Sequence, residues 1–349
     1  MITFIIFILM LGIIVAIHEL GHFSFAKLFG VYVYEYSIGM GKKIFSKKPK
    51  NSETEYSIRM IPIGGFVRLA GEEGEDGDKT VPKEKKLYKK GFIQRFLIFF
   101  MGPGFNFLLA FVTLLISALI FGSVSTAPVV GNVPENYPAY VAGIHEGDTI
   151  LEISGKKIRT WDDILWIVQT SDGSELSFKV KDSLGNLKEL KITPQKVEND
   201  SGGASYVFGI GKNNVKERGV FSSIKYATIK TGSLFKIMIA TVKSLFTGGV
   251  SVNDLSGPVG IYNIIGEQSK GGIENLLYLL AYLSINVGVI NLIPFPAFDG
   301  GHILFLIIEK IRRKPVPEKV EGTLTSIGFI LLILLMIYIT CHDVINLFH

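Results

Sequence analysis

Four long apolar stretches constrain the fold of this 349-residue chain more than any other feature, and they cover residues 2–22, 96–121, 273–295 and 324–339. A helix needs roughly 20 mostly apolar residues to cross the hydrocarbon core of a bilayer. Charged residues make up only 19% of the chain, below the roughly 25% that is usual for soluble domains. We therefore expect a polytopic α-helical membrane protein with four transmembrane helices.

The distribution of lysine and arginine predicts how these helices are oriented. Basic residues are concentrated in residues 23–95 and again in residues 310–319. Because cytoplasmic loops carry an excess of such residues, both segments should be cytoplasmic, and the termini and residues 122–272 should be extracytoplasmic. We expect a location in the cytoplasmic (inner) membrane. The net charge of +5 is small and clusters near span ends, which argues for membrane orientation and against a nucleic acid partner.

The polar parts of the chain predict three further pieces of structure. Residues 126–197 read as short strands separated by turn signals, with one helix that begins after Thr160, and therefore as a small α+β domain. Residues 198–272 read as an extracytoplasmic linker, in which residues 220–246 mix apolar residues with four lysines. We expect an amphipathic helix on the membrane surface there, with a fifth span as the alternative. The N-terminal and C-terminal membrane regions are then residues 1–125 and 273–349.

Within the cytoplasmic loop, residues 54–70 predict a membrane-associated β-hairpin. The sequence alternates partly and breaks at Gly64-Gly65, and Pro62 is tolerated only at an edge strand. An exposed edge can pair with an extended peptide. The alternative is a plain cytoplasmic hairpin that binds nothing.

The pattern His-Glu-Leu-Gly-His at residues 18–22 points to a metal site. On a helix, residues four apart share a face, so the imidazoles of His18 and His22 can reach one ion. Neutral imidazole suits Zn²⁺, and Glu19 beside them can act as the general base on metal-bound water. Ionisable groups inside an apolar span are costly and usually functional. The alternative is a pair of interfacial histidines at the end of a span.

A catalytic zinc site usually has three protein ligands, so a third must come from elsewhere in the chain. Asp299 is the preferred candidate, because it follows the third span and lies at the predicted cytoplasmic end, like His22. His302 is the competitor.

Three asparagines lie in the apolar stretches, namely Asn106, Asn286 and Asn291. A buried amide needs hydrogen-bond partners, and contacts between helices would supply them. Alternatively, Asn286 and Asn291 hold the unwound backbone of a substrate, because a helical peptide must unwind before its carbonyl can be attacked. Pro294 and Pro296 end the third span.

Together these residues resemble the bacterial site-2 intramembrane metalloproteases of the RseP/RasP type. The resemblance covers HELGH, IPIGGFVRL, GPGFN, LSGPVGI and SINVGVINLIPFPAFDGGH. It implies that His18, His22 and Asp299 bind Zn²⁺ and that Glu19 is the catalytic base. It also implies that the substrate is bound by Asn286, Asn291, Pro294, Pro296 and the hairpin.

Residues 138–158 in turn resemble the PDZ domains of bacterial membrane proteases, with Ser154 where that motif usually has Asn or Asp. Such domains bind extended peptides, and a spacer without peptide binding is the alternative. Two further departures are Phe298, where the family has Leu, and a single PDZ-like domain where some members have two.

The expected function is cleavage of transmembrane segments by an intramembrane zinc endopeptidase. By the resemblance, its substrates are single-pass membrane proteins that have already been shortened, such as an anti-sigma factor or a signal-peptide remnant, and the PDZ-like domain excludes bulky ectodomains. A membrane scaffold is one rival, but it gives no reason for His18, Glu19, His22 and Asp299 to occur together. A transporter is another, but it predicts charges deep in several spans and internal repeats, and neither is present in the sequence.

Overall fold

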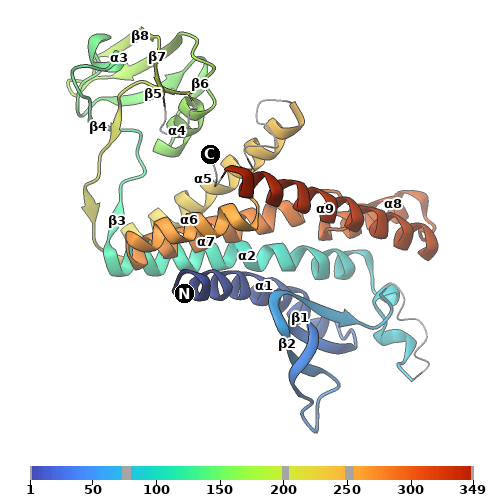
Figure 1. Ribbon diagram of the computed structural model, residues 1–349. Coiled ribbons are helices and arrows are strands. Elements are labelled where there is room, and N and C mark those ends of the chain that lie inside the picture. Colours follow the sequence, from blue (N-terminus) through green and yellow to red (C-terminus); the bar gives the residue numbers. More distant parts are fainter. Residues whose placement is uncertain (1, 73–79, 199–203, 248–254, 347–349) are drawn as a thin grey trace. The chain divides into compact units, whose positions relative to one another are not determined.

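The computed structural model describes residues 2–72, 80–198, 204–247 and 255–346 (Figure 1). The chain forms two compact units, which are described separately. The first combines Met1–Thr113 with Val252–Phe348, and the second is Leu114–Ser251 together with the last residue. We call them the membrane unit and the PDZ-like unit.

Within the described residues, four helices are long and apolar enough to cross a membrane, as the sequence predicts: α1 (Ile2–Leu28), α2 (Phe92–Phe121), α7 (Ile273–Asn291) and α9 (Glu318–Asn346). Their ends differ from the apolar stretches. The helices α1, α2 and α9 continue into polar flanking residues, because backbone hydrogen bonding does not stop where hydrophobicity stops. The predicted third span is too long, since α7 ends at Asn291 and the chain then turns through Pro294 and Pro296, which cannot continue a helix.

The described part of the membrane unit also contains two shorter helices, and neither was expected from the sequence. The first, α6 (Pro258–Lys270), begins with proline in its first turn, where the missing N–H costs nothing. Its Ile265 is fully buried against Phe7 and Met10 of α1 and Leu279 of α7. The sequence places these residues in the predicted linker, whereas in the structure they pack with the membrane helices. The second, α8 (Asp299–Arg312), begins at the predicted metal ligand.

Between α1 and α2 the chain forms a twisted sheet of β1 (Val33–Lys47) and β2 (Glu55–Leu69), followed by two single turns, η1 (Lys83–Lys85) and η2 (Leu87–Lys89). Residues 35–38 of β1 pair with residues 55–58 on one side and with residues 65–68 on the other. The predicted hairpin was therefore wrong in its pairing, since the stretches before and after Gly64-Gly65 flank β1 and do not pair with each other. The reason is that β1, which the sequence analysis missed, supplies the central strand.

A buried charge cluster fixes this sheet. The carboxylate of Glu35 is only 3% exposed and accepts hydrogen bonds from Ser57 Oγ and from Arg59 Nη2, the latter at 2.8 Å. Burial raises the pKa of Glu35, but these bonds and the nearby charges of Arg59 and Lys43 outweigh it, so the net pKa lies below its usual value. The pairing of residues 55–59 with β1 thus depends on a satisfied buried ion pair.

The PDZ-like unit is an α+β fold around one core. Its main sheet has the order β6-β5-β7-β8, made of β6 (Lys156–Lys157), β5 (Thr149–Ile153), β7 (Leu176–Lys181) and β8 (Leu187–Ile192). Shorter pairs join β4 (Val130–Asn132) to β11 (Gly211–Lys212), β9 (Gln195–Glu198) to β10 (Ala204–Val207), and β3 (Ser123–Val124) to β12 (Lys216–Glu217). The helices are α3 (Pro138–Val141), α4 (Trp161–Gln169) and α5 (Val220–Thr247).

In the PDZ-like unit, the start of α4 agrees with the prediction from the sequence, but the end of the domain does not. Thr160 is the N-cap of α4, as predicted, and it forms a capping box with Asp163. The predicted boundary at residue 197 is too early, because Phe208 is buried in the core beside Phe178 and β11 pairs with β4.

The helix α5 is predicted to lie on the membrane surface, yet part of its polar face contacts α4. Lys230 Nζ lies 2.6 Å from Asp162 Oδ1, and the two side chains are 10% and 8% exposed. Ser233 Oγ donates to Thr160 Oγ1, and Ala227 is fully buried on the same face. One of the four lysines of this helix therefore forms a buried ion pair.

We predict that Asp162→Ala destabilises the contact between α4 and α5 by about 3–5 kcal/mol, because it leaves a buried ammonium without its carboxylate. Hydrogen exchange in α4 and the first half of α5 should accelerate by about two to four orders of magnitude. Lys236→Ala, which removes an exposed lysine of the same helix, is the control and should change little. The double variant Asp162→Leu with Lys230→Met should recover most of the protection. Equal exchange in Asp162→Ala and Lys236→Ala would contradict the assignment.

Candidate active site

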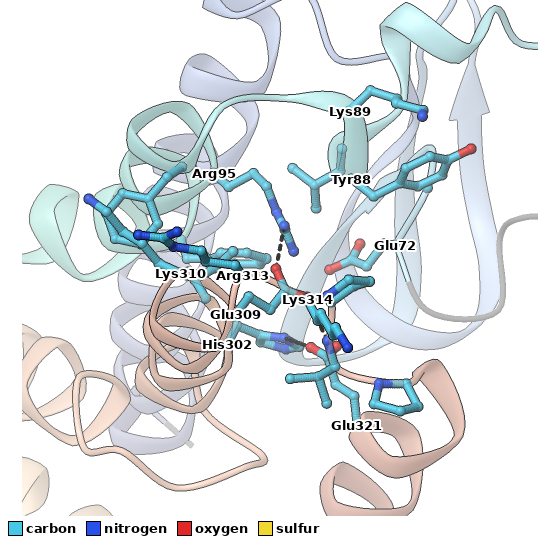
Figure 2. A pocket seen from close by; sticks show the side chains of 18 of the residues that line it. Glu72, Tyr88, Lys89, Arg95, His302, Glu309, Lys310, Arg313, Lys314 and Glu321 are labelled. Carbon is cyan, nitrogen blue, oxygen red and sulfur yellow. Dashed lines mark hydrogen bonds and ion pairs between the residues drawn. The ribbon is translucent and has the colours of Figure 1, made fainter.

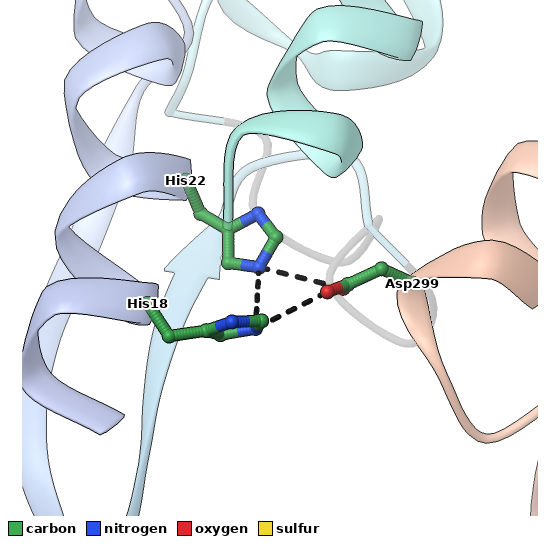
Figure 3. Close-up of side chains that lie close together, drawn as sticks. All are labelled: His18, His22 and Asp299. Carbon is green, nitrogen blue, oxygen red and sulfur yellow. Dashed lines mark hydrogen bonds and ion pairs between the residues drawn. The ribbon is translucent and has the colours of Figure 1, made fainter. Parts of the chain in front are cut away.

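The two histidines of the sequence pattern lie on one buried face of α1. His18 and His22 are 8% and 9% exposed, and their Nε2 atoms are 3.2 Å apart. They share this face because four residues make slightly more than one helical turn. Figure 3 shows both rings projecting from α1 toward a third side chain.

That third side chain is Asp299, the first residue of α8. Its Oδ2 lies 3.1 Å from Nε2 of His18, and its Oδ1 lies 3.4 Å from Nε2 of His22. A carboxylate is favourable at this position, since a helix N-terminus carries partial positive charge. The ligand atoms of these three residues all lie within 4.8 Å of one another.

The geometry of the three groups fits a zinc ion. Tetrahedral zinc with bonds of about 2.0–2.1 Å places its ligand atoms about 3.3 Å apart. The three observed separations, 3.2, 3.1 and 3.4 Å, are close to the edges of such a tetrahedron. Asp299 Oδ2 is also buried and accepts no hydrogen bond among the described residues. These donors can therefore hold Zn²⁺.

Contacts behind the rings set which nitrogen faces the metal position. His22 Nδ1 donates to the carbonyl oxygen of Ile98 at 2.8 Å, so its Nε2 carries a lone pair. The amide of Asn106 lies 3.2 Å from Nδ1 of His18. If His18 Nε2 is to bind a metal, Nδ1 must carry the proton and donate it to the amide oxygen. This orientation also gives a partner to the buried Asn106 Oδ1, which otherwise has no hydrogen-bond partner in the described part of the chain.

Asn106 is thus the residue whose role the sequence left most open. It is fully buried and connects three helices: its side chain contacts His18 of α1, and its carbonyl oxygen accepts a 2.8 Å hydrogen bond from Ser284 of α7. The contact with His18 assigns it to the surroundings of the metal position. The sequence shows a polar residue within an apolar span, but it does not show that this residue contacts His18.

A cavity of about 280 Å³ adjoins these groups. Glu19 lines it, on the same helix as the two histidines. Phe66 and Val67 line the same cavity, so β2 borders the site. Gly65 allows this approach, since a Cβ there would lie 3.1 Å from Cγ of Glu19 and 3.0 Å from Val15.

Only one of the four residues predicted to bind substrate lines this cavity. Asn291 lines the cavity, whereas Asn286, Pro294 and Pro296 are not among its described lining residues. Asn286 lies on α7 with its Oδ1 buried and without a hydrogen-bond partner among the described residues. His302, the competitor of Asp299, lies 3.3 Å from Glu321 through Nδ1 and stacks on Phe99. Asp299, and not His302, completes the group with the two histidines.

Gly102 is a site residue that sequence reasoning missed. A Cβ at this position of α2 would overlap the imidazole of His22, and a Cβ at Gly21 would overlap the backbone of Met101. The helices α1 and α2 therefore approach through two glycines, which is how small residues let membrane helices pack closely. The sequence shows the glycines on either side of Pro103, but it does not show that Gly102 faces His22.

Comparison with known proteins identifies the family of this chain. The sequence signature of peptidase family M50 matches residues 6–335. The chain belongs to this family. It is 35% identical to a putative zinc metalloprotease of Clostridium acetobutylicum, with 97% of this chain and 96% of that protein covered. It is 34% identical to the zinc metalloprotease RasP of Bacillus licheniformis and 33% identical to the regulator of sigma-W protease RasP of Bacillus subtilis, each with 99% of both chains covered.

The expected family and enzyme class are therefore confirmed. This M50 peptidase is a zinc metalloprotease of the RasP/RseP type. Among solved structures, the PDZ domain of an SdrC-like protein from Listeria innocua matches 26% of this chain and 96% of its own, at 23% identity and a TM-score of 0.22.

We predict that Gly102→Ala in this M50 peptidase reduces bound zinc to less than about a tenth of the wild-type content, because the added methyl group displaces His22 by an amount that a metal ligand does not tolerate. Gly104→Ala is the matched control in the same segment, since its Cβ would meet only flexible side chains, with Met101 Sδ nearest at 3.1 Å. Elemental analysis of the purified proteins measures the difference. Normal zinc content in Gly102→Ala would show that His22 is not held against Gly102.

Proposed function

We propose that this M50 peptidase is an intramembrane zinc endopeptidase that cleaves transmembrane segments of single-pass membrane proteins. The observation that carries the proposal is the convergence of His18, His22 and Asp299 beside Glu19, on a helix that is itself apolar and long enough to span a membrane. We propose His18, His22 and Asp299 as the zinc ligands and Glu19 as the catalytic base. A scaffold protein would not need this set of groups at one buried place.

The mechanism follows from what each side chain can do. Bound zinc would polarise the scissile carbonyl and acidify water to a pKa near 7. Glu19 removes the proton from the attacking water and passes it to the leaving amide nitrogen. Asn106 and the Ile98 carbonyl hold the two imidazoles in the tautomer that the site requires.

The border of the cavity suggests how a substrate is held. A transmembrane helix must unwind locally before its carbonyl carbon is accessible, and the freed backbone then needs partners. We propose that the edge of β2 at Phe66 and Val67 pairs with the extended substrate, as in β-strand addition. We further propose that Asn291 binds the freed amides and that Asn286, Pro294 and Pro296 shape the adjoining path. The cavity lining supports Asn291 most directly.

The relatives suggest which proteins are cut. One relative is named as a regulator of sigma-W protease. We propose that the substrates here are likewise membrane proteins shortened by an earlier cut, such as an anti-sigma factor or a signal-peptide remnant. The basic loops support a topology with the site near the cytoplasmic face and with the PDZ-like unit and both termini outside.

We predict that Glu19→Gln keeps about one zinc ion per chain but lowers cleavage by about 10²–10⁴-fold, which is the usual contribution of a general base. The measurement is cleavage of a membrane-spanning substrate in proteoliposomes, with zinc content determined on the same samples. Glu146→Gln, an exposed change in the PDZ-like unit, is the control and should leave the rate unaltered. Undiminished cleavage by a zinc-loaded Glu19→Gln protein would remove Glu19 from the mechanism.

We also propose that the PDZ-like unit restricts access to shortened substrates. The pairing of β3 with β12 brings Val124 and Lys216 together at the base of the domain, which provides a natural point for its removal. Deletion of residues 126–214, combined with Lys230→Met to neutralise the lysine that would lose Asp162, leaves the catalytic residues intact.

This deletion should bring the rates for a short substrate and for one with a bulky ectodomain close together, whereas the full chain should prefer the short one by about tenfold or more. Both rates are measured in the same proteoliposomes, and Lys230→Met alone is the control. If the deleted protein keeps the full preference, the domain does not act as a size filter.

A further inference from the structure

A second cavity, of about 910 Å³, lies in the membrane unit beside the active-site cavity (Figure 2). The two cavities share three lining residues, Glu72, Phe99 and His302. The second cavity is formed by η2, the beginning of α2, the length of α8 and the segment that leads into α9. No part of the proposed catalytic mechanism uses it.

The lining combines an apolar floor with a cationic rim. The floor is defined here as the buried apolar lining residues Leu87, Phe99, Leu306 and Val316. The rim is defined as the exposed basic lining residues Lys89, Lys310, Arg313, Lys314 and Lys319. The cations come from separate elements, so the rim is not the face of a single helix. This combination suits a molecule that is itself apolar at one end and anionic at the other.

Most of the acidic groups in this lining are engaged in holding the walls together. Arg95 Nη1 lies 2.7 Å from Glu309 Oε2, and Glu309 Oε1 accepts a hydrogen bond from the backbone N–H of Val316. Glu321 faces His302 at 3.3 Å. Figure 2 shows both side-chain pairs as dashed lines. These contacts fix α2, α8 and α9 around the cavity.

Several rim cations have no such carboxylate. Among the residues that the structure describes, Lys89, Lys310, Arg313 and Lys314 form no ion pair, although Lys310 lies over the ring of Phe92 at 4.2 Å and Lys89 lies over Tyr88 at 5.5 Å. The rim is therefore left with positive charge that an anionic ligand would neutralise.

The helix dipole explains only part of this pattern. Basic residues stabilise a helix C-terminus, which accounts for Lys310 and Arg312 in the last turn of α8. It does not account for Lys89 in η2 or Lys319 in α9. Arg313 ends α8 with φ 56°, a left-handed conformation that glycine adopts more easily. An arginine at a place where glycine would be less strained suggests that its side chain has a use there.

The position of the cavity identifies the ligand class. It lies where two of the candidate spans begin, at Phe92 of α2 and at Lys319 near the start of α9. Span ends lie at the level of the lipid headgroups. The topology in the proposed function places these ends on the cytoplasmic side, where anionic phospholipids are common and where basic pockets between helices bind their headgroups.

We propose that this cavity binds an anionic phospholipid, with its phosphate held by Arg313 and Lys314 and its glycerol and acyl portion against Phe92, Leu306 and Val316. Lys89 adds positive charge elsewhere at the rim. Arginine suits the phosphate, because its guanidinium donates two parallel hydrogen bonds to neighbouring oxygens. The inference uses the topology of the proposed function, but not its catalytic residues.

The test is calorimetric titration of the full-length protein in a neutral detergent with three probes: dihexanoyl phosphatidylglycerol, dihexanoyl phosphatidylcholine and inorganic phosphate. We expect the wild type to bind phosphatidylglycerol at least about tenfold more tightly than either other probe. The triple variant Lys89→Gln, Arg313→Gln and Lys314→Gln should lose about tenfold of this affinity. Arg312→Gln is the matched control, since Arg312 is exposed on the same helical turn but does not line the cavity.

A single variant separates binding from folding. Arg313→Gly removes one cation and relieves the left-handed arginine, so it should melt no lower than the wild type and still bind phosphatidylglycerol more weakly. The same titration on Glu19→Gln should match the wild type, which keeps this proposal distinct from the catalytic one.

Three results would overturn the lipid assignment. The first is equal affinity for phosphatidylglycerol and phosphatidylcholine. The second is unchanged binding in both the triple variant and Arg313→Gly. The third is tighter binding of inorganic phosphate than of phosphatidylglycerol, which would assign the same cations to a free phosphate group.

Discussion

The membrane unit depends on the meeting of three electron-pair donors in a place that water does not reach freely. With both Nδ1 atoms protonated, the Nε2 lone pairs of His18 and His22 and the carboxylate of Asp299 point at one another at 3.1–3.4 Å. Three acceptors at this distance repel unless a cation lies among them, and the repulsion is strong where the dielectric constant is low. A cation held by these three residues would join α1 to α8, so that one interaction would both serve the proposed chemistry and link the first helix to the C-terminal half of the chain.

Close helix packing makes that meeting possible. The helices α1 and α2 touch through Gly21 and Gly102, which brings the Ile98 carbonyl and the Asn106 amide behind the two imidazoles. The loop before α8 folds just as tightly, since a Cβ at Gly300 or Gly301 would overlap the backbone of Ile293 or Phe295. Lipid gives membrane helices little hydrophobic reason to associate, so contacts of this kind and interhelical hydrogen bonds must supply the energy. Close contacts at these glycines therefore help to position the proposed metal ligands.

The sequence predicted those parts of the fold that are recorded locally. Hydropathy gives the four long helices, helical spacing gives the shared face of His18 and His22, and the Thr160 cap gives the start of α4. It did not predict partners that are distant in sequence. The sheet order around residues 35–38, the burial of Lys230 against Asp162, and the contact of Asn106 with His18 all join segments that no local pattern relates. Asp299 was the exception, because an acidic residue directly after a span has few other reasons to be there.

The helix α8 connects the two cavities. Its first residue is Asp299, and its last turn carries Lys310, beside Arg313 at the rim of the larger cavity. Thirteen steps of 1.5 Å make this helix about 20 Å long, so it measures a fixed distance between the proposed metal site and the proposed headgroup site. Phe99 and His302 form a wall common to both cavities, and their rings stack at 4.8 Å with an interplanar angle of 9°. A phospholipid held at the end of α8 would therefore set the depth of Asp299 below the membrane surface and brace the wall behind it. If the proposed function and the proposed headgroup site both hold, the depth at which a substrate is cut would depend on the length of α8 and on the contacts at its C-terminal end, as well as on the histidines.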